Sequence, residues 1–341
     1  MPGVWRGPTP ARAGHRRRHY RVLGTIRAQA RRRDPLRAAP REPLTGSLPS
    51  LPTPIHAFGT TFQNPILLAA GTAGFGREVA GVIRLDTLGG IVTKAVSREP
   101  RPGHPAPRVA EFAGGMLNAV GLANPGVERV VNEDLPWLRD RLRNARVIVN
   151  VVGSTVADYA AVVGRLADQA IVSALELNVS CPNTARGGEE FGADDGVLSE
   201  LVQACRPVTA KPLIAKLAPT LSNIARTAQV AVRAGADGIS VVNTIPGTLY
   251  RWSGAGAAAP RLGYGQGGVS GPALLAIGVL AVRRVAEGVD CPVIGVGGVR
   301  RPEDVEQYLA AGAVLVGVGT AALADPGVPE RLVAAWGHRR G

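Results

Sequence analysis

A cysteine stands in a polar setting where an apolar stretch ends, in the run LELNVSCPNT at residues 175–184. A free cysteine is most often a small buried hydrophobe, but an accessible thiolate can serve as a base or a nucleophile. Cys181 lies beyond the apolar stretch and before a proline that prevents helix continuation. We therefore predict that Cys181 is catalytic, and that Cys205, in a helical segment, and Cys291, before an apolar run, are buried.

Lysine is rare in this chain, which has 36 arginines and only three lysines. Lys94 and Lys216 stand at the ends of apolar runs, where a compact ammonium differs chemically from a guanidinium fork. These two lysines are predicted to serve a binding site. Lys211 precedes an apolar run and is interpreted as an ordinary surface charge.

Two glycine-rich turns, GVGGVRRPED at 295–304 and GVGTAALADP at 317–326, lie near the carboxyl end of the chain. Glycines at helix starts expose backbone N–H groups, which bind phosphate well. The turns therefore predict a site for a phosphorylated ligand such as FMN.

Short β-branched apolar runs that alternate with helix-like stretches are the elements that must position these residues. Runs of this length suit strands buried on both faces, as in a parallel sheet. Amphipathic stretches between them include residues 155–170 and 222–235, the second ending on Gly235 as a helix stop. The predicted strands are 65–69, 90–94, 147–151, 174–179, 212–217, 238–243, 292–296 and 313–318.

Eight such units predict an α/β fold of the (β/α)₈ TIM-barrel type. A doubly wound sheet is the weaker alternative, because no GxGxxG follows the first strand. The gaps after the second and sixth strands are unusually long, which predicts long mouth loops there that build the site or its lid. Each predicted strand ends in a polar group or glycine, and in a barrel these ends converge on one cavity.

The basic charge of the chain is concentrated in a tail. The formal net charge is +13, but residues 1–50 carry twelve arginines against Asp34 and Glu42. This Arg-rich segment lacks apolar periodicity and is predicted to be a disordered extension, with residues 51–341 forming the catalytic domain. A targeting peptide and a polyanion-binding arm are the alternatives for the tail.

Several other classes of protein are disfavoured by the sequence. The three cysteines form no CxxC pattern and no disulfide framework, and the five histidines show no zinc-type spacing, so we expect no protein-held metal. No apolar run reaches the length of a membrane span. A cytoplasmic location is predicted, and no nucleic-acid partner is expected for the folded part.

Over about residues 53–326, the sequence resembles the dihydroorotate dehydrogenases, flavoprotein barrels of pyrimidine biosynthesis. The motifs that carry the resemblance are IVTKAV, RPGHPAPRV, GGMLNAVGLANPGV, LELNVSCPNT, KLAP, VVNT, GGVSGP, IGVGGV and VGVGTA. The SCPN motif looks like the class 1 enzymes, whose base is cysteine. MLNAVGLANPGV and GGEEFG look like the B-type subgroup, whose catalytic subunit pairs with a flavin and iron–sulfur subunit to use NAD.

The resemblance implies oxidation of dihydroorotate to orotate, with FMN as hydride acceptor and Cys181 as the base. It implies a substrate site made of Lys94, Asn118, Ala119, Val120, Gly121, Leu122, Asn178, Asn183, Asn243 and Thr244. It implies an FMN site made of Ala70, Gly71, Lys94, Ala95, Asn150, Asn178, Lys216, Val242, Gly271, Gly297, Gly298, Gly319 and Thr320. Amides offer a pyrimidine both donor and acceptor, and a lysine suits its carboxylate.

The resemblance also implies a homodimer core, in a heterotetramer with a partner subunit that holds FAD and an iron–sulfur cluster. A dihydropyrimidine or dihydrothymine dehydrogenase-like enzyme is the alternative within the same chemistry. For that enzyme we would expect histidine at the position of Asn183 and no need for Lys94. A polyanion-binding protein that acts through its basic tail is the alternative of another class.

Overall fold

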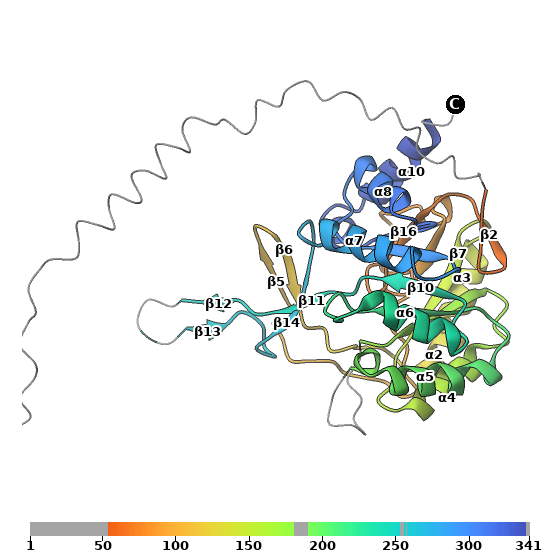
Figure 1. Ribbon diagram of the computed structural model, residues 1–341. Coiled ribbons are helices and arrows are strands. Elements are labelled where there is room, and N and C mark those ends of the chain that lie inside the picture. The colour runs from red at the N-terminus through yellow and green to blue at the C-terminus, as the bar shows by residue number, and fades with distance from the viewer. Residues whose placement is uncertain (1–53, 181–189, 253–255, 257, 339–341) are drawn as a thin grey trace, which may run out of the picture. The chain divides into compact units, whose positions relative to one another are not determined.

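The computed structural model describes residues 54–180, 190–252, 256 and 258–338 (Figure 1). Residues 1–50, predicted to be a separate extension, lie outside this range. Cys181 and Asn183 also lie outside the described residues.

Eight parallel strands form a closed barrel, which confirms the predicted fold. Each strand pairs with the next in chain order, and the last pairs with the first through Val316 and Ile66. The barrel strands are β3 (Ile66–Leu68), β4 (Gly90–Val92), β7 (Arg146–Val151), β8 (Val172–Asn178), β9 (Leu213–Leu217), β10 (Gly238–Val241), β15 (Val293–Val296) and β16 (Leu315–Val318). Every one of them overlaps a run that the sequence predicts as a strand.

Helices surround the barrel and bury their apolar faces against it (Figure 1). The predicted stretch 155–170 contains a helix whose first turn is closed by reciprocal hydrogen bonds between Thr155 and Asp158. The stretch 222–235 contains another, which ends just before Gly235 at φ 112°. The helices are α2 (Val127–Arg129), α3 (Leu135–Arg141), α4 (Val156–Leu166), α5 (Asp195–Cys205), α6 (Ile224–Arg233), α7 (Leu274–Ala286), α8 (Pro302–Ala310), α9 (Thr320–Ala324) and α10 (Val328–His338).

Side chains inside the barrel change from apolar to polar along the strands. Strand residues two apart share a face, so Ile148 and Ile214 point inward together with Asn150 and Lys216, which follow them. A hairpin that precedes the barrel, β1 (Ile55–Ala57) and β2 (Thr60–Phe62), packs its apolar side chains against the apolar interior residues. The polar side chains therefore gather toward the carboxyl ends of the strands.

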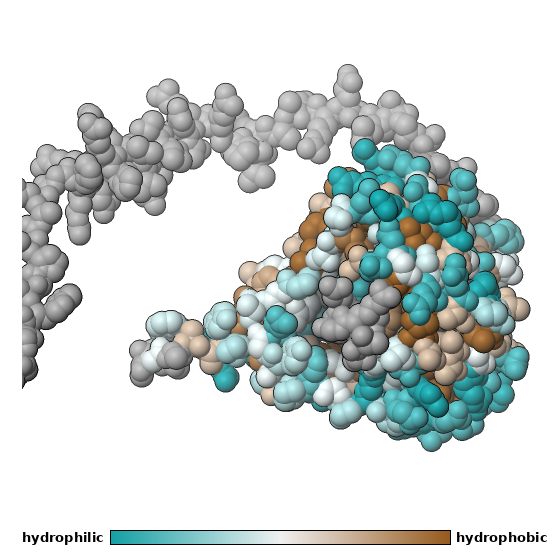
Figure 2. All heavy atoms as spheres, turned by 60° about the horizontal axis from the view of Figure 1, so that its bottom comes forward, coloured by the Kyte–Doolittle hydropathy of each residue, from teal (hydrophilic) through white to brown (hydrophobic). Residues whose placement is uncertain are grey.

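The two long gaps between barrel strands hold a second sheet, which the sequence predicted only as loops. Its strands are β5 (Val109–Phe112), β6 (Gly115–Asn118), β11 (Ile245–Gly247) and β14 (Gly267–Ser270), in the order β11-β14-β6-β5. Between β11 and β14 a short pair, β12 (Tyr250–Arg251) and β13 (Ala259–Pro260), projects away from the barrel (Figure 1). Tyr250 and Trp252 are exposed there, and Figure 2 shows the projection in pale colours of intermediate hydropathy.

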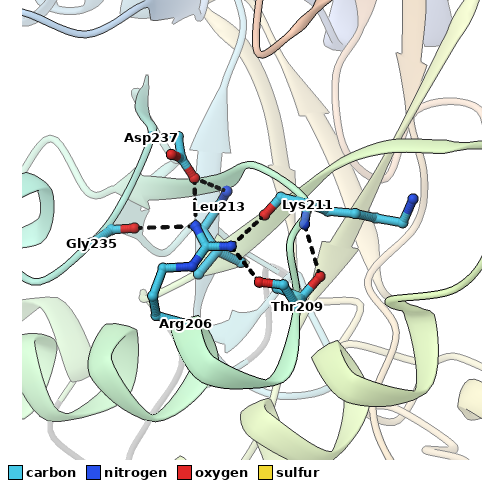
Figure 3. Close-up of polar contacts among 6 residues, drawn as sticks. All are labelled: Arg206, Thr209, Lys211, Leu213, Gly235 and Asp237. Carbon is cyan, nitrogen blue, oxygen red and sulfur yellow. Dashed lines mark hydrogen bonds and ion pairs between the residues drawn. The ribbon is translucent and has the colours of Figure 1, made fainter.

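One arginine fastens the connection that leads from α5 into β9 (Figure 3). The Arg206 guanidinium donates to the backbone oxygens of Thr209 and Lys211 at 2.6 and 2.8 Å. It also donates to Asp237 Oδ2 at 2.7 Å, and the same oxygen accepts from Leu213 N–H at 2.8 Å. Arg206 therefore ties the starts of β9 and β10 to the end of α5.

Of the two described cysteines, Cys205 is buried as predicted, whereas Cys291 is only partly buried. Cys205 is fully buried, and burial raises the pKa of its thiol to about 12. Cys291 is partly buried against the core, and burial together with Asp237 and Asp290 raises its pKa to about 11. Within the described ranges, no helix has the length and apolar character needed to cross a membrane.

Candidate active site

The barrel brings the predicted strand-end residues to one edge. They come from all eight barrel strands, so residues more than 200 positions apart in the chain share this end of the fold. The positions are Ala70 and Gly71 after β3, Lys94 and Ala95 after β4, Asn150 on β7, Asn178 on β8, Lys216 on β9, Val242, Asn243 and Thr244 after β10, Gly297 and Gly298 after β15, and Gly319 and Thr320 after β16.

Two of the predicted amides contact each other across the end of β9. Asn243 Nδ2 donates to Asn178 Oδ1 at 3.1 Å, and Asn243 Oδ1 accepts from Thr244 N–H at 2.8 Å. The hydroxyl of Tyr159 on α4 donates to the backbone oxygen of Asn178 at 2.7 Å. These bonds hold both amides in place, and the Asn178 side-chain amino group stays on the same edge as a donor.

The three lysines occupy different environments. Lys216 is buried at 6% exposure, whereas Lys94 is partly exposed and its backbone N–H donates to Gly74 O at 2.8 Å. Lys211 lies at the opposite end of the barrel, where its ammonium donates to Val172 O at 2.8 Å. Its prediction as an ordinary surface charge is therefore wrong in one respect: burial lowers its pKa, and it supports the backbone at the start of β8.

A buried polar network lies just inside the edge. Glu176 Oε1 accepts from Asn150 Nδ2 at 2.7 Å and lies 3.8 Å from Lys216 Nζ. Asn150 Oδ1 and the Ser240 hydroxyl are buried and have no hydrogen-bond partner among the described residues. Buried polar atoms without partners are costly, so these two are suited to a polar ligand in the barrel mouth.

The glycine turn after β15 needs glycine at a specific position. Gly298 has φ 75°, and a Cβ there would lie 2.6 Å from the backbone nitrogen of Leu275. The Tyr308 hydroxyl donates to Gly297 O at 2.7 Å. Glycine at this position therefore lets the turn pack closely against the start of α7.

The start of α8, the helix that follows this turn, was predicted to offer free backbone N–H groups, and two of them are already bound. The N–H groups of Arg300 and Arg301 donate to Asp304 Oδ2 at 2.9 and 3.1 Å. Because Asp304 already engages them, the start of α8 does not offer these two N–H groups to a phosphate. After β16 the helix α9 begins directly at Thr320, and the Thr320 hydroxyl donates to Ser270 Oγ at 2.8 Å.

The predicted substrate residues 118–122 lie on and after β6 of the second sheet. Asn118 Nδ2 donates to Gly268 O on β14 at 3.2 Å. Ala119 is buried, Val120 O accepts from His104 N–H at 3.2 Å, and Gly121 and Leu122 have φ values of 69° and 56°. Gly271 follows β14, and a Cβ there would lie 2.7 Å from the Cα of Gly115.

Several residues of the edge were not identified from the sequence. Glu176, Ser240 and Ser270 contribute polar groups, while Tyr159 and Tyr308 hold backbone oxygens of predicted site residues. Glu176 carries a signal that could have found it, because it is a charge at an inward position of an otherwise apolar strand. In the described part of the chain, no group of three His, Cys, Asp or Glu side chains could hold a metal ion.

Comparisons with known proteins agree on one family. The model of the dihydroorotate dehydrogenase family matches residues 54–336. A protein of Geobacillus kaustophilus named dihydroorotate dehydrogenase B (NAD(+)), catalytic subunit, is 43% identical over 276 residues, which cover 81% of this chain and 87% of that protein. Proteins of the same name from Alkaliphilus metalliredigens and Bacillus thuringiensis are also 43% identical, over 80% and 81% of this chain and 88% and 87% of theirs.

Proposed function

Because the chain belongs to the dihydroorotate dehydrogenase family, we propose that it oxidises dihydroorotate to orotate in pyrimidine biosynthesis, with FMN at the carboxyl edge of its barrel. The observation that carries this proposal is the family match over the whole barrel. The polar lining of one edge supports it, because the strand-end residues that the resemblance assigns to the site share this end of the barrel.

The residues at this edge fit FMN. The buried Asn150 Oδ1 and Ser240 hydroxyl need polar partners, which a flavin ring can supply. The turn at Gly297 and Gly298 and the start of α9 at Thr320 are partly exposed, and glycine turns at helix starts suit a phosphate. When bound, FMN would accept the hydride from the substrate. The residues proposed to hold it are Ala70, Gly71, Lys94, Ala95, Asn150, Asn178, Lys216, Val242, Gly271, Gly297, Gly298, Gly319 and Thr320.

The chain offers matching groups for the substrate. The Lys94 ammonium would neutralise the substrate carboxylate, and a charge-assisted hydrogen bond of this kind is stronger than a neutral one. The amides of Asn118, Asn178, Asn183 and Asn243 would pair with the ring amides, since each presents both a donor and an acceptor. The contact between Asn178 and Asn243 fixes two of these amides before substrate arrives.

Cys181 is the proposed base that removes the proton from C5 of the substrate. Two of the three cysteines are poorly suited, because burial raises the pKa of Cys205 to about 12 and that of Cys291 to about 11. In the sequence, Cys181 stands three residues after Asn178, the last residue of β8. A base at this position removes one proton while hydride leaves the neighbouring carbon.

A partner subunit is proposed to carry the electrons onward to NAD. The relatives are named as catalytic subunits of an NAD(+)-linked enzyme, which supports a separate electron-transfer subunit that holds FAD and an iron–sulfur cluster. The three cysteines of this chain cannot supply the four thiolates that such a cluster usually takes. We propose a heterotetramer built on a homodimer of this chain, in a reducing cytoplasm.

The test is to purify the chain alone and with its partner. The isolated protein should be yellow, should release a flavin monophosphate on heating, and should reduce artificial dyes with dihydroorotate. NAD reduction should appear only when the partner is added. A colourless protein that FMN cannot reconstitute would refute the cofactor, and efficient NAD reduction by the chain alone would refute the partner.

A further inference from the structure

Glu176 is the one acidic side chain that is both buried and on a barrel strand among the described residues. The other buried acids of that range, Asp134 and Asp304, lie outside the barrel strands. Glu176 is 1% exposed and lies on β8, which pairs with β7 on one side and with β9 on the other. Its side chain therefore reaches residues of both neighbouring strands on the inner face of the barrel.

Both contacts of Glu176 converge on one oxygen atom. Oε1 accepts from Asn150 Nδ2 at 2.7 Å and lies 3.8 Å from Lys216 Nζ. The first is a hydrogen bond, whereas the second is too long for one and acts through charge. The Asn150 bond fixes the carboxylate, and the fixed carboxylate attracts the ammonium.

A buried pair of charges such as Glu176 and Lys216 is not expected to stabilise the folded protein. The side chains of Lys216 and Glu176 are 8% and 2% exposed, and removing two such charges from water costs about as much as their attraction returns. The interior positions nearer the amino ends of the same strands hold Ile148, Ala174 and Ile214. An apolar pair would fit the same barrel, so the charges point to a role toward the ligand.

We propose that Glu176 is a positioning residue of the flavin site, which acts through Lys216 by restraining its ammonium and offsetting part of its charge. This proposal rests on the proposed function, because it requires FMN in the barrel mouth next to Lys216. The carboxylate sets how much positive charge Lys216 presents to the flavin, and thereby how readily the flavin accepts electrons.

The sign of the effect follows from charge. Reduction places negative charge on the flavin ring, and a nearby cation stabilises that charge. Replacing Glu176 by neutral glutamine keeps an oxygen that can accept from Asn150 but removes the charge that offsets Lys216. The reduction potential of the bound flavin should therefore rise in Glu176→Gln and fall in Lys216→Met.

A double-mutant cycle tests whether Glu176 acts through Lys216. The reduction potential of bound flavin is measured in the wild type, Glu176→Gln, Lys216→Met and the double variant, with Glu128→Gln as a control that removes an exposed carboxylate paired with Arg165. We expect the upward shift caused by Glu176→Gln to shrink at least about twofold when Lys216 is already replaced, because no ammonium is then left for the carboxylate to restrain. The control should leave the potential unchanged.

Equal shifts in both backgrounds would overturn the proposal, because Glu176 would then act on the flavin directly. An unchanged or lowered potential in Glu176→Gln would also overturn it. A wild-type protein that binds no FMN would instead refute the proposed function, so the two failures are distinguishable.

The thermal unfolding of the flavin-free protein gives a second readout. Each single variant leaves one buried charge without its partner, whereas the double variant removes both charges. The double variant should therefore unfold at a higher temperature than Lys216→Met. If the second substitution lowers the midpoint further, the two side chains do not form a pair and the proposal fails.

Discussion

The carboxylate of Asp86 accepts two hydrogen bonds from Asn144, one from its backbone N–H at 2.8 Å and one from its side-chain Nδ2 at 3.0 Å. Asp86 lies in the connection between β3 and β4, and Asn144 stands just before β7. The same carboxylate accepts from the backbone N–H groups of Arg143 and Ala145 at 2.8 and 3.0 Å. This contact joins the approaches to two neighbouring barrel strands, β4 and β7.

The Asp86 contact should make stability depend on pH. Burial alone would raise the pKa of Asp86, but the hydrogen bonds from residues 143–145 outweigh burial and lower it. A carboxylate whose pKa is lower in the folded than in the unfolded protein stabilises the fold at pH values above its unfolded-state pKa of about 3.9. This stabilisation is lost as the pH falls through its folded-state pKa. Asp86→Asn should therefore cost about 1 kcal/mol at pH 7, since partial exposure weakens the effect, and progressively less below about pH 4.

Urea unfolding of both proteins from pH 7 to pH 3 measures this difference. Asp140→Asn is the matched control, because Asp140 is exposed and pairs only with its exposed neighbour Arg139 among the described contacts. A difference between Asp86→Asn and wild type that stays constant across this range would contradict the prediction.

Cys181→Ser should keep flavin and substrate binding but slow flavin reduction at neutral pH by about 10²–10⁴-fold, because a hydroxyl is a far poorer base than a thiolate. Wild-type reduction should accelerate with rising pH as more thiolate forms. Stopped-flow half-reactions with dihydroorotate measure both effects. Cys291→Ser makes the same change at a thiol whose pKa is raised to about 11, and it should reduce flavin at the wild-type rate.

Lys94→Met should raise the KM for dihydroorotate by about 10- to 100-fold, since a hydrogen bond to a charged group contributes about 1.5–3 kcal/mol. Uncharged dihydrouracil, which lacks the carboxylate, should lose no affinity. Steady-state kinetics with both compounds checks this, and Lys211→Met at the opposite end of the barrel is the control. Better turnover of dihydrouracil than of dihydroorotate by the wild type would favour a dihydropyrimidine dehydrogenase-like enzyme.

Arg206→Met should destabilise the fold by about 2 kcal/mol, because it leaves the backbone oxygens of Thr209 and Lys211 without their donor. Arg165→Met removes an arginine that pairs with the exposed carboxylate of Glu128, and should cost less than about 1 kcal/mol. Chemical denaturation compares the two variants. An equal cost for both would mean that the backbone contacts of Arg206 add nothing.

The barrel could be predicted because each strand has a recognisable local sequence pattern. Each is a continuous apolar run bounded by glycine, proline or a polar residue, and the amphipathic stretches between them have helical periodicity. The polar residues at the strand ends could then be assigned to one edge, since a barrel brings the carboxyl ends of its strands together.

The second sheet and the buried charge pair could not be predicted in this way. Strands β11 and β14 contain proline or several glycines and have only three or four residues, so they carry no periodic signal. Their stability comes from partners far along the chain, as in the pairing of Gly268 with Asn118. The pairing of Glu176 with Lys216 likewise depends on which strands become neighbours and on which side chains point inward.

The distance along the chain between β6 and β14 has a consequence for how the protein folds. Asn118 and Gly268 are 150 residues apart, so their hydrogen bond closes a very long loop. Contacts of this kind form slowly, and during synthesis β6 emerges long before its partner strand. The part of the site that carries Asn118 can therefore reach its final arrangement only after most of the barrel has been synthesised, which leaves the edge of β6 opposite β5 unpaired in the nascent chain.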